Sequence, residues 1–368
     1  MKKILVFLLA GLLAIMFAAC GGGASDGPAS GGDGASGGGA SGSASGGGSG
    51  DASGSADAVT WKFTHEEGAG EFQDVYSHKF KEVIEAASNG RITIEIYRVG
   101  ELGEGVDQVE MLMNGGVQLG LNDPGWTTAY IPEANIFELH WALPEDILVY
   151  NKIMHEGEMA KYLSDLYEQN NMHVIDWIPS AYYMWTADKP LQTPADYKGF
   201  KMRTMAAPII QASYQAYGAD TMTTPYLELY SALQLKMADG QTNPLYGIVG
   251  MKFYEVQSSL TVSKPNAFVS TFCANPAFWA GLSDEDKQLV EEAAQAANDY
   301  IMEYSQTYDE EKLAELEAYG TNIVELTDEQ KSAFKEASTP VRGEYLKLAP
   351  AGGQKMLDLL EQDVANIK

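Results

Sequence analysis

The stretch from Thr193 to Asn243 constrains the fold most strongly, because its pattern is that of one α/β unit. Gly199 interrupts the chain, and Phe200 to Thr204 has the length and composition of a short strand. Ala207 to Tyr217 suits a helix, which Gly218 is expected to end because glycine readily adopts the left-handed conformation found at helix C-termini. A strand followed by a covering helix is the repeating unit of α/β proteins.

The second half of this stretch predicts another helix and another extended segment. The helix is expected over Leu227 to Lys236. Its apolar stripe is expected to hold Leu229, Leu233 and Lys236, with Tyr230 beside them. Asp239-Gly240 then turns the chain, so that Asn243-Pro244 ends the extended segment.

Arg203 and Asn243 therefore occupy equivalent places, each at the end of a predicted strand. In open α/β sheets, ligands bind outside the carboxyl ends of the strands. An arginine at such a position offers a planar fork of donors that fits a carboxylate. The alternatives are a surface arginine and an ordinary Asn-Pro turn.

The part of the chain before this stretch predicts a parallel sheet. Strands and helices alternate in the order β-α-β-α-β, and a parallel sheet is the usual outcome of that order. The expected elements are Thr60 to Thr64, Phe72 to Ser88, Ile92 to Tyr97, Val106 to Asn114 and Leu119 to Leu121. Residues 133–171 are expected to be largely helical, with two strands after them at Val174 to Ile178 and Tyr182 to Ala187.

The last hundred residues predict one strand and several helices. Ala267 to Cys273 is the strand, and Ser283 is expected to cap a helix that continues to Ala318. This helix is longer than is typical of globular proteins. Thr327 begins a capping box for the next helix, and Met356 to Ile367 is expected to be the last one.

The N-terminus has the features of a lipoprotein signal peptide. Lys2-Lys3 precedes an apolar run, and small residues lead to Cys20. Residues 1–19 are therefore expected to be the signal peptide, with lipid attached to Cys20; an uncleaved anchor helix is the alternative. Residues 20–58 are the lipidated cysteine and a tether of Gly, Ser, Ala and Asp, a composition that cannot bury a core.

Charge and cysteine content exclude several classes of partner. The formal net charge is −27, so nucleic acid and anionic lipid surfaces should repel the chain, and the membrane is contacted only through the N-terminal lipid. With Cys20 lipidated, Cys273 is alone and is expected to be a buried thiol without a disulfide.

The sequence gives little support for catalysis, because the segment from His155 to Met159 lacks the second histidine of a zinc-binding helix.

Several ordered motifs resemble one family, the solute-binding proteins of TRAP (tripartite ATP-independent periplasmic) transporters. The closest likeness is in Tyr197-Lys198-Gly199-Phe200-Lys201-Met202-Arg203, in Glu228-Leu229-Tyr230-Ser231-Ala232-Leu233-Gln234 and in Asp239-Gly240-Gln241-Thr242-Asn243-Pro244. Further similar segments are Gly90 to Gly120, Phe137-Glu138-Leu139 and Phe253 to Gln257. The resemblance covers the chain from Val59 to the C-terminal helices.

The resemblance implies a fold of the periplasmic-binding-protein type, with two α/β lobes, a ligand cleft between them and a long helix that spans both. Residues 59–181 and 269–308 would form lobe I. Residues 182–268 and 309–368 would form lobe II and the C-terminal helices. Ligand binding would close the lobes about the strands that cross between them.

The resemblance also implies roles for individual residues. Arg203 would hold a ligand carboxylate with Asn243 beside it, and Trp126, Tyr226 and Met205 would line the cleft. The family often has a second arginine where this chain has Tyr183, which favours ligands with one acidic group. Glu66 and Asp123 would face Arg203, an arrangement that suits a zwitterion whose amine meets carboxylates and aromatic rings. The alternatives are acids that face solvent and aromatic residues that only fill the core.

The expected function is that of an extracytoplasmic, lipid-anchored protein that captures a small organic acid. It would deliver the acid to the small and large membrane subunits of a TRAP transporter, with no metal and no cofactor. Two alternatives remain. One is the binding subunit of a sensor or of another transporter class, and the other is an extracytoplasmic enzyme that uses Glu66 or Asp123 as a base.

Overall fold

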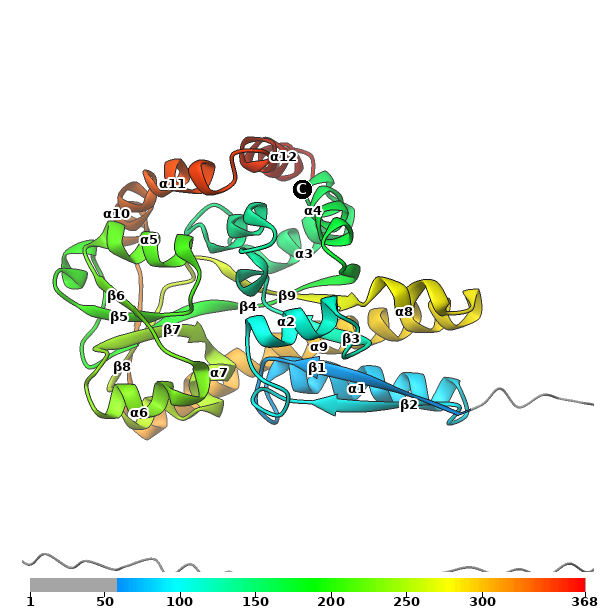
Figure 1. The fold of residues 1–368 in the computed structure, drawn as a ribbon. Helices are drawn as coiled ribbons and strands as arrows, with labels where there is room; N and C mark the ends of the chain where they lie inside the picture. The colour runs from blue at the N-terminus through cyan, green and yellow to red at the C-terminus, as the bar shows by residue number, and fades with distance from the viewer. Residues whose placement is uncertain (1–57, 368) are drawn as a thin grey trace, which may run out of the picture. The chain divides into compact units, whose positions relative to one another are not determined.

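The computed structural model describes residues 58–367, so the predicted signal peptide, Cys20 and all but the last residue of the predicted tether lie outside the described residues. Ten strands pair into one sheet in this part of the chain, and helices pack on it (Figure 1). Along its main path the strand order is β2-β1-β3-β9-β4-β7-β5-β6, with β8 and β10 joined at the side of β4. The order places two α/β lobes side by side, with β4 and β9 between them.

The first lobe is built as its sequence pattern predicts. Strands β1 (Val59–His65), β2 (Ile92–Tyr97) and β3 (Leu119–Asn122) are parallel, with β1 in the middle. Helices α1 (Phe72–Ala87) and α2 (Val106–Met113) make the two connections. The β-α-β-α-β prediction is therefore confirmed. Strand β9 (Ala267–Ala274) adds to β3 in the antiparallel direction.

The second lobe contains the stretch from Thr193 to Asn243. Strand β5 (Lys201–Thr204) lies parallel between β6 (Asp220–Thr223) and β7 (Gly240–Pro244). Helix α5 (Pro208–Tyr217) ends as predicted at Gly218, which has a φ of 103°. Helix α7 (Leu245–Gly250) follows β7, while β8 (Ser259–Val262) and β10 (Asn322–Glu325) pair with each other.

The prediction of a helix over Leu227 to Lys236 is only partly right. A 3₁₀ turn at Tyr226–Glu228 leads into α6 (Leu229–Gln234), which is two residues shorter than expected at its end. Lys236 is exposed and has a left-handed φ of 57°, so it is not part of the apolar stripe. The buried residues of α6 are Leu229, Ala232 and Leu233.

One long strand, β4 (His173–Ala187), replaces the two strands predicted at 174–178 and 182–187. Its first part pairs with β9 and its last five residues pair with β7, so a single strand belongs to both lobes. Pro179 lies between the two predicted strands, and proline cannot donate to a sheet. The register shifts between Pro179 and Ala181, and this irregularity lets the strand continue past the proline.

The long helix predicted after Ser283 is confirmed as α9 (Asp284–Tyr319), with 36 residues. The Ser283 hydroxyl accepts a hydrogen bond from the backbone of Asp286, and Gly320 ends the helix in the left-handed conformation. Helix α9 packs on α1 and β4 and also on α7 and β10. It therefore spans both lobes, as the resemblance implied.

Most of the remaining helices lie on one side of the sheet (Figure 1). Residues 133–171 form a 3₁₀ segment (Pro132–Glu138) and two helices, α3 (Ile147–Glu156) and α4 (Glu158–Gln169). Three helices follow α9: α10 (Asp328–Ser338), which has the predicted capping box at Thr327, α11 (Val341–Leu348) and α12 (Gly353–Asn366). The short helix α8 (Pro276–Gly281) precedes α9. Helices α10 and α11 pack on α5, and α12 packs on α4.

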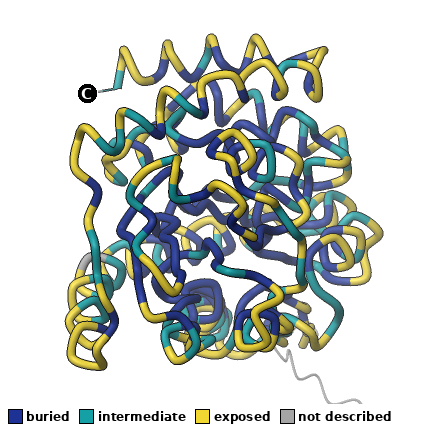
Figure 2. Tube along the Cα trace, turned by 90° about the vertical axis from the view of Figure 1, so that its left-hand side faces the viewer, coloured by how far each residue is buried: buried dark blue, intermediate teal, exposed yellow. Residues whose placement is uncertain are grey.

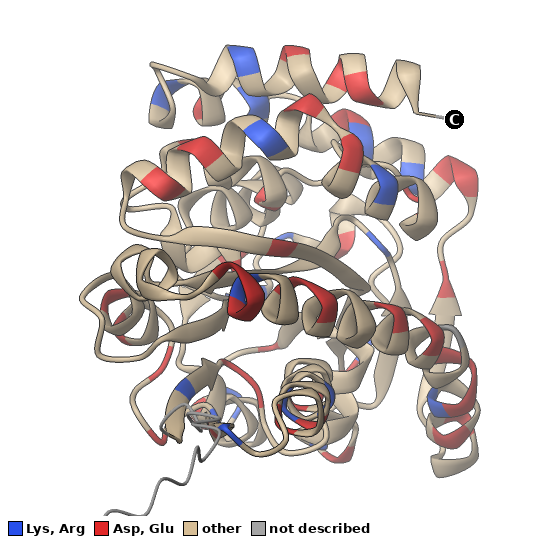
Figure 3. Cartoon of the chain, turned by 90° about the vertical axis from the view of Figure 1, so that its right-hand side faces the viewer, with Lys and Arg blue, Asp and Glu red and all other residues tan. Residues whose placement is uncertain are grey.

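Buried residues follow the sheet and the inner faces of the helices, while the outer faces are exposed (Figure 2). Cys273 is fully buried in β9, as predicted. Acidic residues spread over several helices rather than gathering in one patch (Figure 3). Within residues 58–367, no helix combines the length and the apolar character needed to cross a membrane.

Candidate functional site

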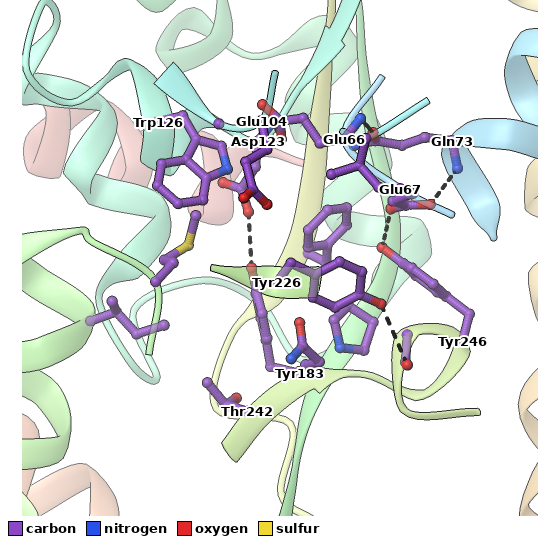
Figure 4. A pocket seen from close by; sticks show the side chains of 18 of the residues that line it. Glu66, Glu67, Gln73, Glu104, Asp123, Trp126, Tyr183, Tyr226, Thr242 and Tyr246 are labelled. Atoms are coloured by element: carbon purple, nitrogen blue, oxygen red, sulfur yellow. Dashed lines mark hydrogen bonds between the residues drawn. The ribbon is translucent and has the colours of Figure 1, made fainter. Parts of the chain in front are cut away.

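A pocket lies between the two lobes, at the ends of β1, β3, β5 and β7. Its empty volume is about 660 Å³, open solvent at the mouth included. All eight residues expected to contact the ligand line this pocket: Glu66, Asp123, Trp126, Tyr183, Arg203, Met205, Tyr226 and Asn243. Five of them, Glu66, Asp123, Trp126, Tyr183 and Tyr226, are labelled in Figure 4. The structure thus brings together residues that are up to 177 positions apart in sequence.

Arg203 lies at the end of β5 with only 4% of its surface exposed. Its Nε and Nη2 atoms donate to the carbonyl oxygen of Thr224, at 2.9 and 2.6 Å, and this fixes the plane of the guanidinium. No Asp or Glu among residues 58–367 forms a salt bridge with it. Burial lowers the pKa of Arg203 to about 10, so it stays positively charged at neutral pH. Nη1 has no hydrogen-bond partner among residues 58–367.

Asn243 is placed beside Arg203 by the pairing of two parallel strands. Arg203 of β5 is opposite Gln241 of β7, so Asn243 lies two residues farther toward the carboxyl end of the sheet. The Asn243 amide donates to the Gln241 side chain, which orients it. A second N–H and a carbonyl oxygen of Asn243 are available for a ligand.

Two carboxyl groups of the first lobe line the pocket with different local bonding. Both oxygens of Asp123 accept hydrogen bonds, one from the backbone of Gly125 at 2.7 Å and one from the Tyr183 hydroxyl at 3.0 Å. Glu66 accepts from the backbone N–H of Asp123 through Oε2 at 2.8 Å. Its Oε1 is buried and has no partner within residues 58–367. Glu66 therefore has a carboxylate oxygen available to a donor from a ligand.

Burial governs the ionisation of both acids. Burial, and next the charge of Asp123, raise the pKa of Glu66 well above its usual range. Burial also raises the pKa of Asp123 to about 6, although bonds from Gly125 and Tyr183 oppose the rise. A positive charge from a ligand would favour the ionised form of these acids.

Aromatic side chains form the walls. The indole of Trp126 packs against Gly105, where a Cβ atom would lie 3.0 Å from the ring. Gly105 also has a φ of 58°, so this close approach depends on glycine. On another side, the ring of Phe268 lies between those of Tyr183 and Tyr246, with centroid distances of 5.7 and 5.9 Å.

Several lining residues were not predicted from the sequence. Glu67 is the clearest case, because neighbours in a strand point to opposite faces and only one of Glu66 and Glu67 would be expected to face a pocket. Strand β1 ends at His65, however, and the chain turns there, so both glutamates reach the pocket. Further lining residues without an assigned role are Gln73, Glu104, Ile210, Thr242, Tyr246 and Phe268.

Tyr246 is another lining residue that was not predicted. Its hydroxyl donates to Glu67 at 2.6 Å (Figure 4). The pocket as a whole holds one arginine and four carboxyl groups, which are Glu66, Glu67, Glu104 and Asp123. This combination suits a ligand that carries both a negative and a positive group.

Comparisons with known proteins agree with this geometry. The model of one protein family, bacterial extracellular solute-binding protein family 7 (DctP), matches residues 63–348. The ectoine-binding periplasmic protein TeaA of Halomonas elongata is 34% identical over 317 residues, which cover 85% of this chain and 92% of TeaA.

Solved structures show the same fold. The periplasmic ectoine-binding protein of the TeaABC TRAP transporter of Halomonas elongata superposes with a TM-score of 0.81 and 34% identity, covering 84% of this chain and all of that one. A TRAP periplasmic solute-binding protein of Marinobacter aquaeolei, described as an apo open structure, gives a TM-score of 0.76 at 32% identity, covering 82% of this chain and 99% of that one.

Proposed function

The chain belongs to the DctP family of TRAP transporter solute-binding proteins, and we propose that it captures a small zwitterionic acid with one carboxylate and one cationic group. Its relatives are binding subunits of transporters and not enzymes. The proposal rests on one observation above all. The pocket holds a buried arginine edge and a buried carboxylate oxygen, on Arg203 and Glu66, and neither has an ionic partner among the described residues.

The ligand would lie between the two lobes. Its carboxylate would bind Arg203 from the second lobe, with Asn243 orienting it. Its cationic group would bind Glu66 from the first lobe, next to Asp123 and the aromatic rings. Ectoine, the ligand in the name of the relative from Halomonas elongata, has this chemistry: a ring amidinium and one carboxylate. We therefore propose ectoine and similar cyclic amino acids as the ligand class.

Delivery and location complete the proposal. The filled protein would pass its ligand to the two membrane subunits of a TRAP transporter. The segment Phe17-Ala18-Ala19-Cys20 supports attachment to the outer face of the cytoplasmic membrane, or to an outer membrane, through lipid on Cys20.

A thermal unfolding screen of the full chain tests the ligand class. The panel contains ectoine, an acyclic amino acid, succinate, benzoate and an uncharged amide. A ligand that binds only the folded protein adds about 2.7 kcal/mol of stability at a hundredfold excess over Kd, enough to raise Tm by several degrees. We expect ectoine to raise Tm and succinate to leave it unchanged. A rise with succinate alone would contradict the zwitterion, and no rise with any acid would contradict organic-acid binding.

The substitution Tyr183→Arg should change the charge preference of the pocket. The new guanidinium would lie beside Asp123, where the Tyr183 hydroxyl is now bonded, and would neutralise that acid. We expect affinity for succinate to rise relative to ectoine by about 1.5–3 kcal/mol, the usual contribution of a hydrogen bond to a charged group. Isothermal titration calorimetry measures both affinities.

The matched control for this substitution is Tyr230→Arg. Tyr230 is bonded to Glu255 on the surface of the second lobe, so the control adds the same charge to the whole molecule without reaching the pocket. If both variants change the preference equally, the effect comes from net charge and Tyr183 does not contact the ligand.

A further inference from the structure

Two tyrosines of the second lobe hold one short loop of the first lobe. The Tyr226 hydroxyl donates to Glu71 at 3.0 Å, and the Tyr246 hydroxyl donates to Glu67 at 2.6 Å. Both glutamates belong to the loop between β1 and α1 (66–71), whereas Tyr226 follows β6 and Tyr246 lies in α7. Both tyrosines also line the ligand pocket. The same side chains therefore contact the pocket and join the lobes.

Glycines allow this close approach between the lobes. A Cβ atom on Gly250 would lie 2.5 Å from the Glu71 carboxylate, and one on Gly247 would lie 2.8 Å from the Tyr226 hydroxyl. Any larger residue at either position would force the loop or the tyrosine to move. The two lobes therefore pack closely at this contact, where only 5% of Glu67 and 3% of Glu71 is exposed.

The charges around this contact are unbalanced. Glu67 and Glu71 also accept backbone hydrogen bonds, from Gln73 at 2.7 Å and Gly68 at 3.0 Å. The titratable groups that face the two glutamates are Glu66, Asp74, Tyr226, Tyr246 and Tyr308, none of which is a cation. Nearby Arg98 and His65 bond to Asp74 instead.

Two neighbouring buried carboxyl groups without a cation do not both ionise, because like charges and lost hydration oppose it. When the lobes separate, water reaches both groups and this restriction ends. We propose that the pairs Tyr226–Glu71 and Tyr246–Glu67 form a latch whose closing takes up a proton, so that mild acid favours the closed arrangement of the lobes.

The direction and the range of the effect follow from the ionisation of Glu71. Burial raises its pKa from the ordinary 4.5 to about 7, although bonds from Gly68 and Tyr226 oppose the rise. Burial and the neighbouring Glu71 also raise the pKa of Glu67 well above its usual range. Between pH 4.5 and about 7, Glu71 therefore binds more protons in the closed form than in the open form. Glu71 alone therefore makes the closed-to-open ratio fall as pH rises from 4.5 to about 7, and the raised pKa of Glu67 adds a further fall in the same direction.

Distances between the lobes test the latch without any ligand. Spin labels are placed on the full chain at Glu82→Cys in α1 and Gln234→Cys in α6, both exposed positions. The background carries Cys20→Ala, and Cys273 is buried. Pulsed electron paramagnetic resonance then gives the closed and open populations from pH 4.5 to 8. One proton changes their ratio by up to about tenfold per pH unit.

Variants separate the latch from a general effect of pH. In Glu67→Gln/Glu71→Gln neither latch residue titrates while both acceptors remain, so we expect a smaller pH dependence, and what remains comes from other buried acids such as Glu66 and Asp123. In Tyr226→Phe/Tyr246→Phe both donors are lost, and the open population should increase at every pH. The control is Tyr230→Phe, which breaks a Tyr–Glu bond of 3.1 Å inside one lobe and should keep the original pH profile. Two results would overturn the proposal. One is a closed-to-open ratio that does not change with pH in the spin-labelled chain with both tyrosines and both glutamates intact. The other is a pH dependence of that ratio that is unchanged in the double glutamine variant.

Discussion

Replacing Arg203 by alanine is expected to weaken ligand binding by about 2–5 kcal/mol while leaving the fold intact. Removing one partner of a buried charge pair usually has an effect of this size, because the other charge stays buried and unpaired. Arg203 is the only arginine or lysine that lines the pocket within the described residues, so no other side chain can replace it. The fold should tolerate the change, since the side chain bonds only to the carbonyl oxygen of Thr224.

Two further variants make the result specific. Arg203→Lys keeps the charge but loses the planar fork, so we expect an intermediate affinity. Arg342→Ala removes an exposed arginine whose contact with Glu361 is 3.7 Å, and it should leave affinity unchanged. Calorimetry measures affinity, and circular dichroism confirms folding. Equal affinities for the Arg203→Ala variant and the original chain would show that the ligand carboxylate binds elsewhere.

Arg203 and Asn243 could be expected at the pocket from their places in α/β units, whereas the family resemblance was needed for Glu66, Asp123, Trp126, Tyr183, Met205 and Tyr226. Arg203 and Asn243 each end a strand that glycines delimit, and parallel strands bring their carboxyl ends to one edge. Helix boundaries could be predicted closely because the helix ends carry clear sequence signals, such as Gly218 after α5 and Ser283 before α9.

The parts that could not be predicted depend on contacts between distant segments. Strands β6, β8 and β10 were not predicted, because four residues are too few to show a period. The equally short β3 and β5 were predicted only from their places in α/β units. Glu71 and Tyr226 are 155 positions apart, and no local pattern relates them. The continuity of β4 through Pro179 could not be predicted either, because it depends on pairing with the distant strand β9.

The charge of the whole molecule also bears on the ligand. A net charge of −27 repels anions at long range, so an acid needs strong local attraction to enter the pocket. A zwitterion has no net charge and does not meet this repulsion. The acidic residues distributed over the surface (Figure 3) are therefore more compatible with a zwitterion than with a dicarboxylate.

Replacing Glu66 by glutamine is expected to remove the preference for a cationic group. The amide keeps an oxygen that can accept from the Asp123 backbone, so the loop should keep its shape. It cannot become negative, whereas a bound cation would draw the ionised form from the glutamate. We expect ectoine to lose about 2–5 kcal/mol of binding free energy, as for other buried charge pairs. A monocarboxylate without a cation should bind as well as before or better.

The control for this experiment is Glu104→Gln, at a partly exposed acid of the same pocket. Solvent screens a charge at that position, so the loss should stay below about 1 kcal/mol. Combining Arg203→Ala with Glu66→Gln adds a further test. If one zwitterion bridges the two residues, the double variant loses less than the sum of the single losses, because either change alone already breaks the bridge. Strictly additive losses would mean that the two residues act on different parts of binding and that the ligand does not connect the lobes.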